Sequence, residues 1–336
     1  TSINMAMQPF KMMVGDMVNE KQKGLAYSIQ SFLCNAGSLV GFLFPFIFTW
    51  IGISNIAPQG VVPDSVIYSF YIGAAILILC VIYTTVKVKE MPPAEYAEYH
   101  GITEEEEKEK INMVKLLVKA PKAFWTVGLV QFFCWFAFMF MWTYTNGSVA
   151  ANVFDAPTVE TVVNGISKIM LDTKSIQYQN AADWVGVLFA VQAIGSVLWA
   201  VCIPMFKNRK QIYSLSLILG GIGFISTYFV HNQYILFISF LLIGCAWAAM
   251  LALPFTILTN ALSGGHMGTY LGLFNGTICI PQIVAAALGG SILALFTPKG
   301  MLPPEINMLV MAGVMLIIGA VCVYLIKETK GEQAKA

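Results

Sequence analysis

Amide and indole side chains recur at helical spacing along one apolar segment of the chain. Gln131, Trp135, Trp142 and Asn146 follow one another at i, i+4, i+11 and i+15, so on a helix they share one face. An amide side chain both donates and accepts hydrogen bonds, and an indole offers a flat ring to C–H groups. This combination suits an uncharged ligand that carries hydroxyl groups.

The elements that must position these residues are membrane-spanning helices. Hydrophobic residues make up 57% of the chain and charged residues only 11%, which is too few charges for the surface of a soluble domain. Crossing a bilayer takes about 20 helical residues, and long apolar runs are typical of helices rather than of barrel strands. We therefore predict an all-α polytopic transmembrane bundle. The uncharged runs that predict its helices are 28–52, 66–86, 123–144, 184–206, 234–259, 269–297 and 307–326, with a shorter run at 212–230 and a segment at 1–14 interrupted by Lys11.

Basic residues are divided unevenly between alternate loops. Sixteen of the 19 Lys and Arg lie in segments 11–27, 87–122, 207–211 and 327–336, and three lie in the intervening loops. Because cytoplasmic loops are enriched in Lys and Arg, the first set and the C-terminus are predicted to be cytoplasmic. The 145–182 segment is then external. We expect an exposed loop there, with a short amphipathic helix over TVETVVNGISKIM as the alternative.

Enzyme, metal and cofactor chemistry find no support in the residues. The seven Cys fall one per apolar run without ligand spacing, and the three His lie in loops. No nucleophile elbow, phosphate loop or zinc-protease motif is present in the sequence. We therefore expect no enzyme activity, no cofactor, no metal ion and no nucleic-acid partner. All 18 Asp and Glu lie in loops or at helix ends, and Asp155 and Asp183 are interpreted as solvated loop residues.

Two segments 245 residues apart resemble each other. AMQPFKMM at 6–13 and LALPFTIL at 251–258 both place Pro-Phe near the cytoplasmic end of an apolar helix. Six predicted helix steps separate them, as in transporters built from parallel six-helix repeats. Three helices precede the second Pro-Phe helix within its half, and none precedes the first. The chain is thus predicted to carry helices 4 to 12 of a twelve-helix fold, with helices 1 to 3 missing.

Four segments carry a resemblance to a known family, and together they extend along nearly the whole chain. They are NMAMQPFKMMVGD, CWFAFMFMWTYTNGSVA, GCAWAAMLALPFTILTNAL and GTYLGLFNGTICIPQIVA. In these the chain resembles the major facilitator superfamily, and within it the sucrose/maltose-type sugar permeases related to glycoside–pentoside–hexuronide cation symporters.

The resemblance implies alternating access by two six-helix halves, with the sugar bound midway between them. It implies a monomer in a cell membrane, here a bacterial inner membrane, and a coupling carboxylate ahead of Thr1 or in helix 1. Where related permeases often have Thr-Asp at the end of helix 7, this chain has Thr145-Asn146. The predicted domains are 1–86 for helices 4 to 6, 87–122 for a cytoplasmic loop, 123–326 for helices 7 to 12 and 327–336 for a cytoplasmic tail.

Amide-bearing faces occur on several of the predicted helices. Amide groups that face lipid are costly, so these faces should point inward. Such groups also form hydrogen bonds between helices without any ligand, and Trp142 also fits an anchor at the membrane interface. The predicted substrate-binding residues are Asn4, Gln8, Gln30, Gln131, Trp135, Trp142, Asn146, Gln192, Trp247, Asn275 and Gln282.

The charged turn after the first apolar segment is a candidate gate. Lys11, Asp16 and Lys23 lie there, and the alternative is a set of interfacial charges without a role in transport. The function predicted from residues and resemblance together is proton-coupled symport of a small sugar, a disaccharide of the maltose or sucrose type. A sodium-coupled melibiose-type symporter and a non-transporting membrane sugar sensor are the alternatives.

Overall fold

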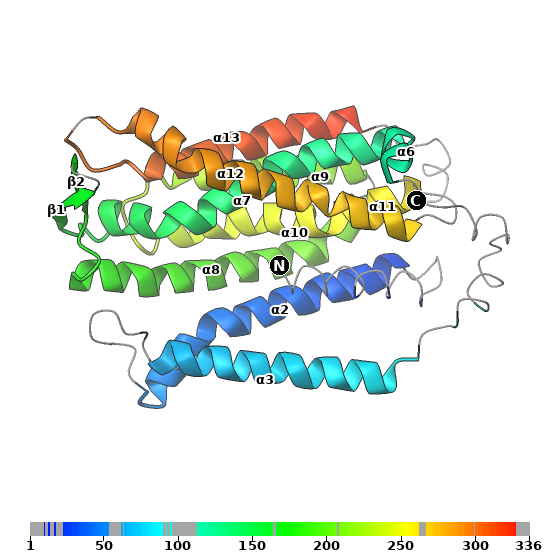
Figure 1. Cartoon of the computed structure of the whole chain (residues 1–336), viewed down its shortest axis with the longest axis horizontal. Helices are drawn as coiled ribbons and strands as arrows, with labels where there is room; N and C mark the ends of the chain where they lie inside the picture. Colours follow the sequence, from blue (N-terminus) through cyan, green and yellow to red (C-terminus); the bar gives the residue numbers. More distant parts are fainter. Residues whose placement is uncertain are drawn as a thin grey trace.

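The chain forms a bundle of long helices lying side by side, with one β-hairpin at one end (Figure 1). The computed structural model describes residues 10, 13, 17, 23–53, 62, 64–89, 92, 95, 113–163, 166–206, 208–261, 267–298 and 300–326. The helices are α2 (Lys23–Trp50), α3 (Asp64–Lys87), α6 (Met113–Val118), α7 (Lys122–Asn152), α8 (Ile176–Cys202), α9 (Arg209–Ser226), α10 (Leu236–Ala261), α11 (Met267–Phe274), α12 (Gly276–Phe296) and α13 (Ile306–Cys322). Short 3-10 turns at Ile203–Met205 and Val323–Leu325 extend α8 and α13.

The predicted apolar runs correspond to these helices, so the all-α transmembrane fold class is confirmed. Within the described residues, six helices are long and apolar enough to cross a membrane. The run at 269–297 is divided at Asn275 into α11 and α12, and the shorter run at 212–230 is α9. The predicted segment 1–14 lies outside the described residues except for Phe10 and Met13.

The predicted external segment contains a β-hairpin, so the expected short helix was wrong. Most of the described hairpin residues are exposed, as expected for a loop, but they form regular strands. Strand β1 (Thr158–Val163) pairs antiparallel with β2 (Ile166–Leu171). The strands are rich in Thr, Val and Ile, whose branched side chains favour extended backbone. Asn-Gly stands between them in the sequence, which is the strongest short signal for a hairpin. We call this end of the bundle the hairpin end.

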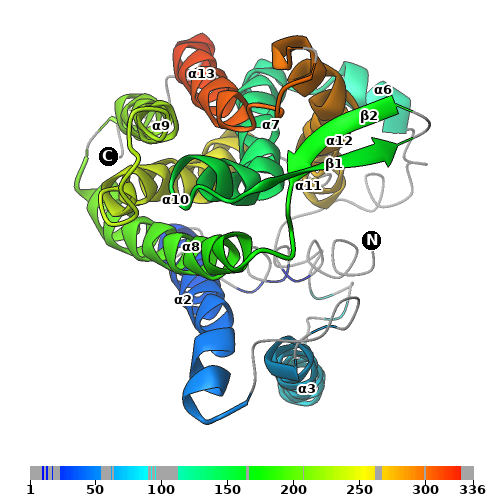
Figure 2. The ribbon, with the colours of Figure 1, turned by 90° about the vertical axis from the view of Figure 1, so that its left-hand side faces the viewer.

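Helix α7 lies at the centre of the larger group of helices. Figure 2, which faces the hairpin end, shows α7 with α8, α10, α12 and α13 around it, and each of these four contacts it. Helix α9 packs against α10 and α13. The core that they share is built from aromatic and branched side chains, among them Phe138, Phe140, Phe224, Phe240 and Leu316.

Glycines bring α8 and α10 into backbone contact. A side chain on Gly244 would overlap with the backbone of Gln192, and one on Gly195 would lie 2.6 Å from the carbonyl oxygen of Leu241. Only glycine allows helices to approach this closely. The same contact brings Gln192 of α8 close to α10.

Helix α2 joins the first part of the chain to this bundle through α8. Ser196 Oγ donates a hydrogen bond to Asn35 Oδ1 at 3.1 Å, and both side chains are buried. The rings of Phe42 and Phe189 lie 5.7 Å apart in the same contact. Helix α3 lies beyond α2, away from the bundle (Figure 2). Asn35 was not among the predicted functional residues, and its hydrogen bond with Ser196 shows that it lies on the side of α2 that meets α8.

Candidate substrate site

Helix α7 is the element that presents the amide and indole side chains. It starts after Pro121, whose fixed φ suits a helix start, and continues for 31 residues with no charged residue after Lys122. Gln131 and Trp135 are buried, Asn146 is partly buried, and Trp142 is 42% exposed. Because α7 is one helix over this range, the helical period places the four residues along one side of it, as predicted from their spacing.

One half of the Gln131 amide has a structural partner in α10. Gln131 Nε2 donates to the backbone oxygen of Met250 at 3.1 Å. Pro254 lies four residues after Met250 inside α10 and has no N–H, so this carbonyl lacks its helical donor. The amide of Gln131 supplies the missing hydrogen bond. The other half of the amide, Oε1, is buried and has no partner among the described residues.

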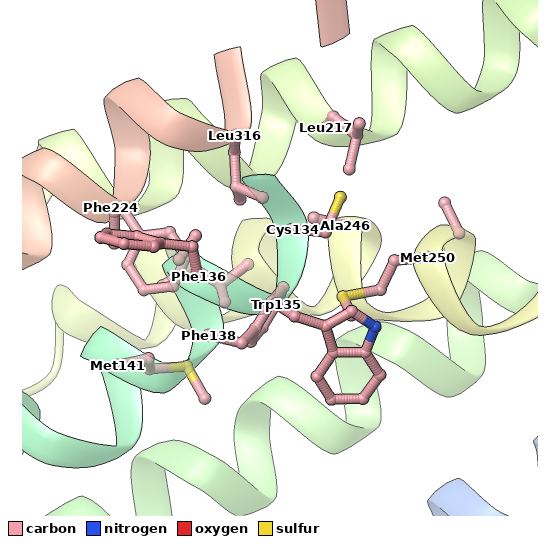
Figure 3. Close-up of a cluster of buried hydrophobic side chains, with 14 of the residues drawn as sticks. Cys134, Trp135, Phe136, Phe138, Met141, Leu217, Phe224, Ala246, Met250 and Leu316 are labelled. Atoms are coloured by element: carbon pink, nitrogen blue, oxygen red, sulfur yellow. The ribbon is translucent and has the colours of Figure 1, made fainter. Parts of the chain in front are cut away.

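Three tryptophans meet beside Gln131. The ring centre of Trp247 of α10 lies 5.8 Å from those of Trp135 and Trp142 of α7, and its ring plane is nearly perpendicular to both. The rings of Trp135 and Trp142 are themselves 6.4 Å apart. Phe138 closes the cluster at 4.9 Å from Trp247. Edge-to-face contacts of this kind hold aromatic rings in defined orientations. Figure 3 shows the Trp135 indole on the opposite side of α7 from Cys134 and Leu217, where it is still part of the buried core.

Unpaired polar atoms are concentrated on this side of α7. Four buried side-chain polar atoms of the described residues have no hydrogen-bond partner, and three of them belong to α7: Gln131 Oε1, Trp135 Nε1 and Asn146 Oδ1. A buried polar atom without a partner costs about 1–3 kcal/mol, which a ligand group or a bound water can offset. The set offers one donor and two acceptors, as hydroxyl groups require.

At the hairpin end, Asn146 is connected to a tyrosine and lies near a carboxylate. Asn146 Nδ2 donates to the Tyr178 hydroxyl of α8 at 3.0 Å. Glu305, which immediately precedes α13, contacts α7 at Gly147. Burial raises the pKa of the Glu305 carboxyl from 4.5 to about 7. Glu305 was not among the predicted residues, and the only sequence signal for it was a single acid directly before an apolar span.

The remaining predicted residues have different outcomes. Gln192 is buried, and Trp247, Gln30, Asn275 and Gln282 are partly buried. Their role in substrate binding stays a prediction. The predictions for Asn4, Gln8, Lys11 and Asp16 lie outside the described residues, and Lys23 starts α2 without a described side chain.

A cavity with a volume of roughly 490 Å³ lies elsewhere, at the hairpin end between α9 and α13. Its lining is almost entirely apolar, with Ile225, Phe229, Val310 and Val314 among its residues. Such a lining suits hydrocarbon rather than a hydroxylated solute. We therefore take the tryptophan face of α7, and not this cavity, as the candidate substrate site.

A sequence model of the Major Facilitator Superfamily matches residues 3–170 and, again, residues 149–336. The chain belongs to the Major Facilitator Superfamily. No curated protein matches the chain well enough to count as a relative. Together with the six apolar helices, membership makes this a multi-pass membrane protein of a transporter family whose members act on small substrates. The central helix of this superfamily member, α7, also carries three of the four unpaired buried polar atoms of the described residues.

Proposed function

We propose that this superfamily member is a secondary active transporter that carries a disaccharide of the maltose or sucrose type in symport with protons. The observation that carries the proposal is the unpaired Trp135 Nε1 and Gln131 Oε1 beside a cluster of three tryptophans. A sugar hydroxyl accepts from the first atom and donates to the second, while the C–H face of a sugar ring stacks on indole.

The same residues suggest how sugar binding is connected to helix movement. Gln131 uses its Nε2 to hold the Met250 carbonyl, which Pro254 leaves without a helical partner. Proline positions are where helices bend, because one backbone hydrogen bond is missing. A sugar bound at Gln131 Oε1 therefore acts on the side chain that holds α10 at its bending point. In an alternating-access cycle, this contact lets the occupied site favour one arrangement of α7 and α10 over the other.

The length of α7 limits what a single sugar can contact. Trp135 and Asn146 are separated by eleven residues, which corresponds to roughly 16 Å along the helix axis. One disaccharide centred on Trp135 reaches Gln131 and the neighbouring tryptophans more readily than Asn146. We assign the central position to binding and place Asn146 at the outer entrance, on the assumption that the hairpin end is external and the C-terminus cytoplasmic.

Two alternative functions predict different results in transport and binding assays. A sodium-coupled melibiose-type symporter would show sugar accumulation that depends on sodium rather than on a proton gradient. A non-transporting sugar sensor would bind sugar without moving it. Both would use the same face of α7, because both need the same recognition of hydroxyl groups.

The test is counterflow of labelled maltose and labelled sucrose in proteoliposomes that contain the full-length protein. Counterflow needs binding and alternating access but no ion gradient, so we expect exchange of at least one of the two sugars. Binding without exchange would identify a sensor. Pyranine trapped inside the vesicles reports proton entry when sugar is added; a signal that requires sodium would favour the sodium-coupled alternative.

A further inference from the structure

Glu305, at the hairpin end, does not cap α13, the helix that it directly precedes. Glu305 occupies the N-cap position of α13, yet its side chain makes no capping hydrogen bond there. It reaches the neighbouring α7 instead. A methyl group on Gly147 of α7 would overlap with the Glu305 carboxylate, so this glycine is what allows the carboxylate to lie against the helix.

The ionisable groups that face Glu305 are hydroxyls rather than cations. Its charge acts on Tyr144 of α7 and on Tyr178 of α8. Helices α12 and α13 contain no Asp, Glu, Lys, Arg or His, and the half of α9 nearer the hairpin end contains none either. Among the described residues, burial is the one influence on Glu305, and no basic side chain offsets it. Lys299 lies outside the described residues.

One of the two hydroxyls is joined to Asn146, at the outer entrance of the candidate substrate site. Tyr178 already accepts a hydrogen bond from Asn146 Nδ2, so its hydroxyl proton remains free for an acceptor. An ionised Glu305 attracts this O–H dipole and leaves the oxygen lone pair to Asn146. A protonated Glu305 exerts no such attraction, so the Tyr178 hydroxyl loses the charge that orients it. The charge of Glu305 therefore bears on the orientation of Asn146, whose Oδ1 is buried and unpaired.

We propose that Glu305 is the proton-binding group of this transporter, and that Tyr178 and Asn146 transmit its charge state to the substrate site on α7. This inference rests on the proposed proton-coupled function. It places the coupling carboxylate at the start of α13, whereas the resemblance implied one ahead of Thr1 or in helix 1. Closing α13 and α7 over a neutral carboxyl costs far less than closing them over a charged one, so closure of the hairpin end is tied to proton uptake.

The experiment compares Glu305→Gln with a matched control, Glu160→Gln, which neutralises an exposed carboxylate of the hairpin at the same end. Both are tested in the full-length protein with labelled maltose and sucrose. We expect Glu305→Gln to keep counterflow within about threefold of the wild type while accumulation driven by a proton gradient falls about tenfold or more. Wild-type counterflow should change with pH around pH 7, and the change should be absent in Glu305→Gln. Glu160→Gln should match the wild type in both assays.

A second readout does not depend on transport. The native carboxyl binds its proton up to a higher pH than the unfolded one, so it contributes stability that is lost as pH rises from 4.5 to about 7. We expect the melting temperature of the purified wild type to fall over this window more steeply than that of Glu305→Gln. Tyr178→Phe should keep this slope but lose the pH dependence of counterflow, because the link to Asn146 is cut.

The outcomes separate this inference from the proposed function. If the wild type exchanges neither sugar, the sugar proposal fails. The slope of the melting temperature against pH then decides by itself whether Glu305 titrates. Accumulation that survives in Glu305→Gln, or an identical slope in Glu305→Gln and the wild type, overturns the inference. Loss of both counterflow and accumulation with a normal melting temperature also overturns it, because Glu305 would then be required for movement rather than for coupling.

Discussion

Helices α7 and α3 are both long and apolar enough to span a membrane, yet their surroundings are opposite. Of the most apolar window of α7, 67% is buried in the protein, against 6% for α3, although α3 has the higher mean hydropathy. Helix α7 holds three unpaired polar atoms, whereas α3 exposes Phe70, Tyr71 and Leu79. Lipid tails are as apolar as a protein core, so hydropathy alone does not draw a helix into the bundle. Polar groups do, because lipid cannot satisfy them.

The largest effect is expected from removing an aromatic ring from the α7 face. Trp135→Ala deletes the buried ring that packs against Trp247, and we expect a loss of about 2–3 kcal/mol of contact energy and a roughly 100-fold loss of sugar exchange. Tyr71→Ala removes an exposed ring of α3 and should change exchange less than about twofold. Labelled-sugar counterflow measures both. An equal loss in the two variants would mean that α3 also lines the site.

A smaller effect is expected from adding a methyl group where helices touch. Gly244→Ala places this group against the backbone of Gln192 and should lower the melting temperature by roughly 5 °C, because backbone atoms cannot move aside. Gly73→Ala in α3 meets open space and improves helix propensity, so the melting temperature should stay level or rise slightly. Thermal unfolding of the purified proteins in one detergent provides the comparison. A drop for Gly73→Ala would show that α3 is packed more tightly than the structure indicates.

The smallest effect isolates one hydrogen bond. Trp135→Phe keeps an aromatic ring but removes the unpaired Nε1 donor, so the half-saturating sugar concentration in counterflow should rise roughly 3- to 12-fold. Trp125→Phe makes the same replacement at an exposed position of α7 and should leave it unchanged. If Trp135→Phe binds sugar as well as the wild type, the indole acts only through stacking and its nitrogen is paired with water.

How much of the site could be predicted depended on how far apart its parts are in the sequence. The shared face of Gln131, Trp135 and Trp142 follows from helical periodicity alone, because all three lie on one helix. That Trp247 packs against both tryptophans depends on how α10 packs against α7, which periodicity does not specify. The partner of Gln131 likewise required the two helices to be placed so that its amide reaches the carbonyl left open by Pro254.

The residues that the sequence did not predict as functional were missed for the same reason, because their surroundings come from distant segments of the chain. Glu305 was placed correctly at a helix end, but it lies against α7 where Gly147 leaves room for its carboxylate, and Gly147 is 158 residues away in the sequence. Asn35 is buried where α2 meets α8, and its hydrogen bond with Ser196 depends on that contact between helices. The hairpin was missed for the opposite reason. Its signals, branched residues around Asn-Gly, are local, and the interpretation as a loop gave them too little weight.

Sequence alone was enough to predict that this protein is embedded in a membrane and which segments form its helices. It was also enough to show a resemblance to the Major Facilitator Superfamily. Apolar runs and charged loops decide these features locally, since the bilayer penalises each exposed polar group separately. The packing of the helices was needed to show which buried polar atoms lack partners, which tryptophans are in contact, and which carboxylate is partly buried. These properties depend on the groups that other helices bring within a few ångströms, and no spacing within one helix specifies them.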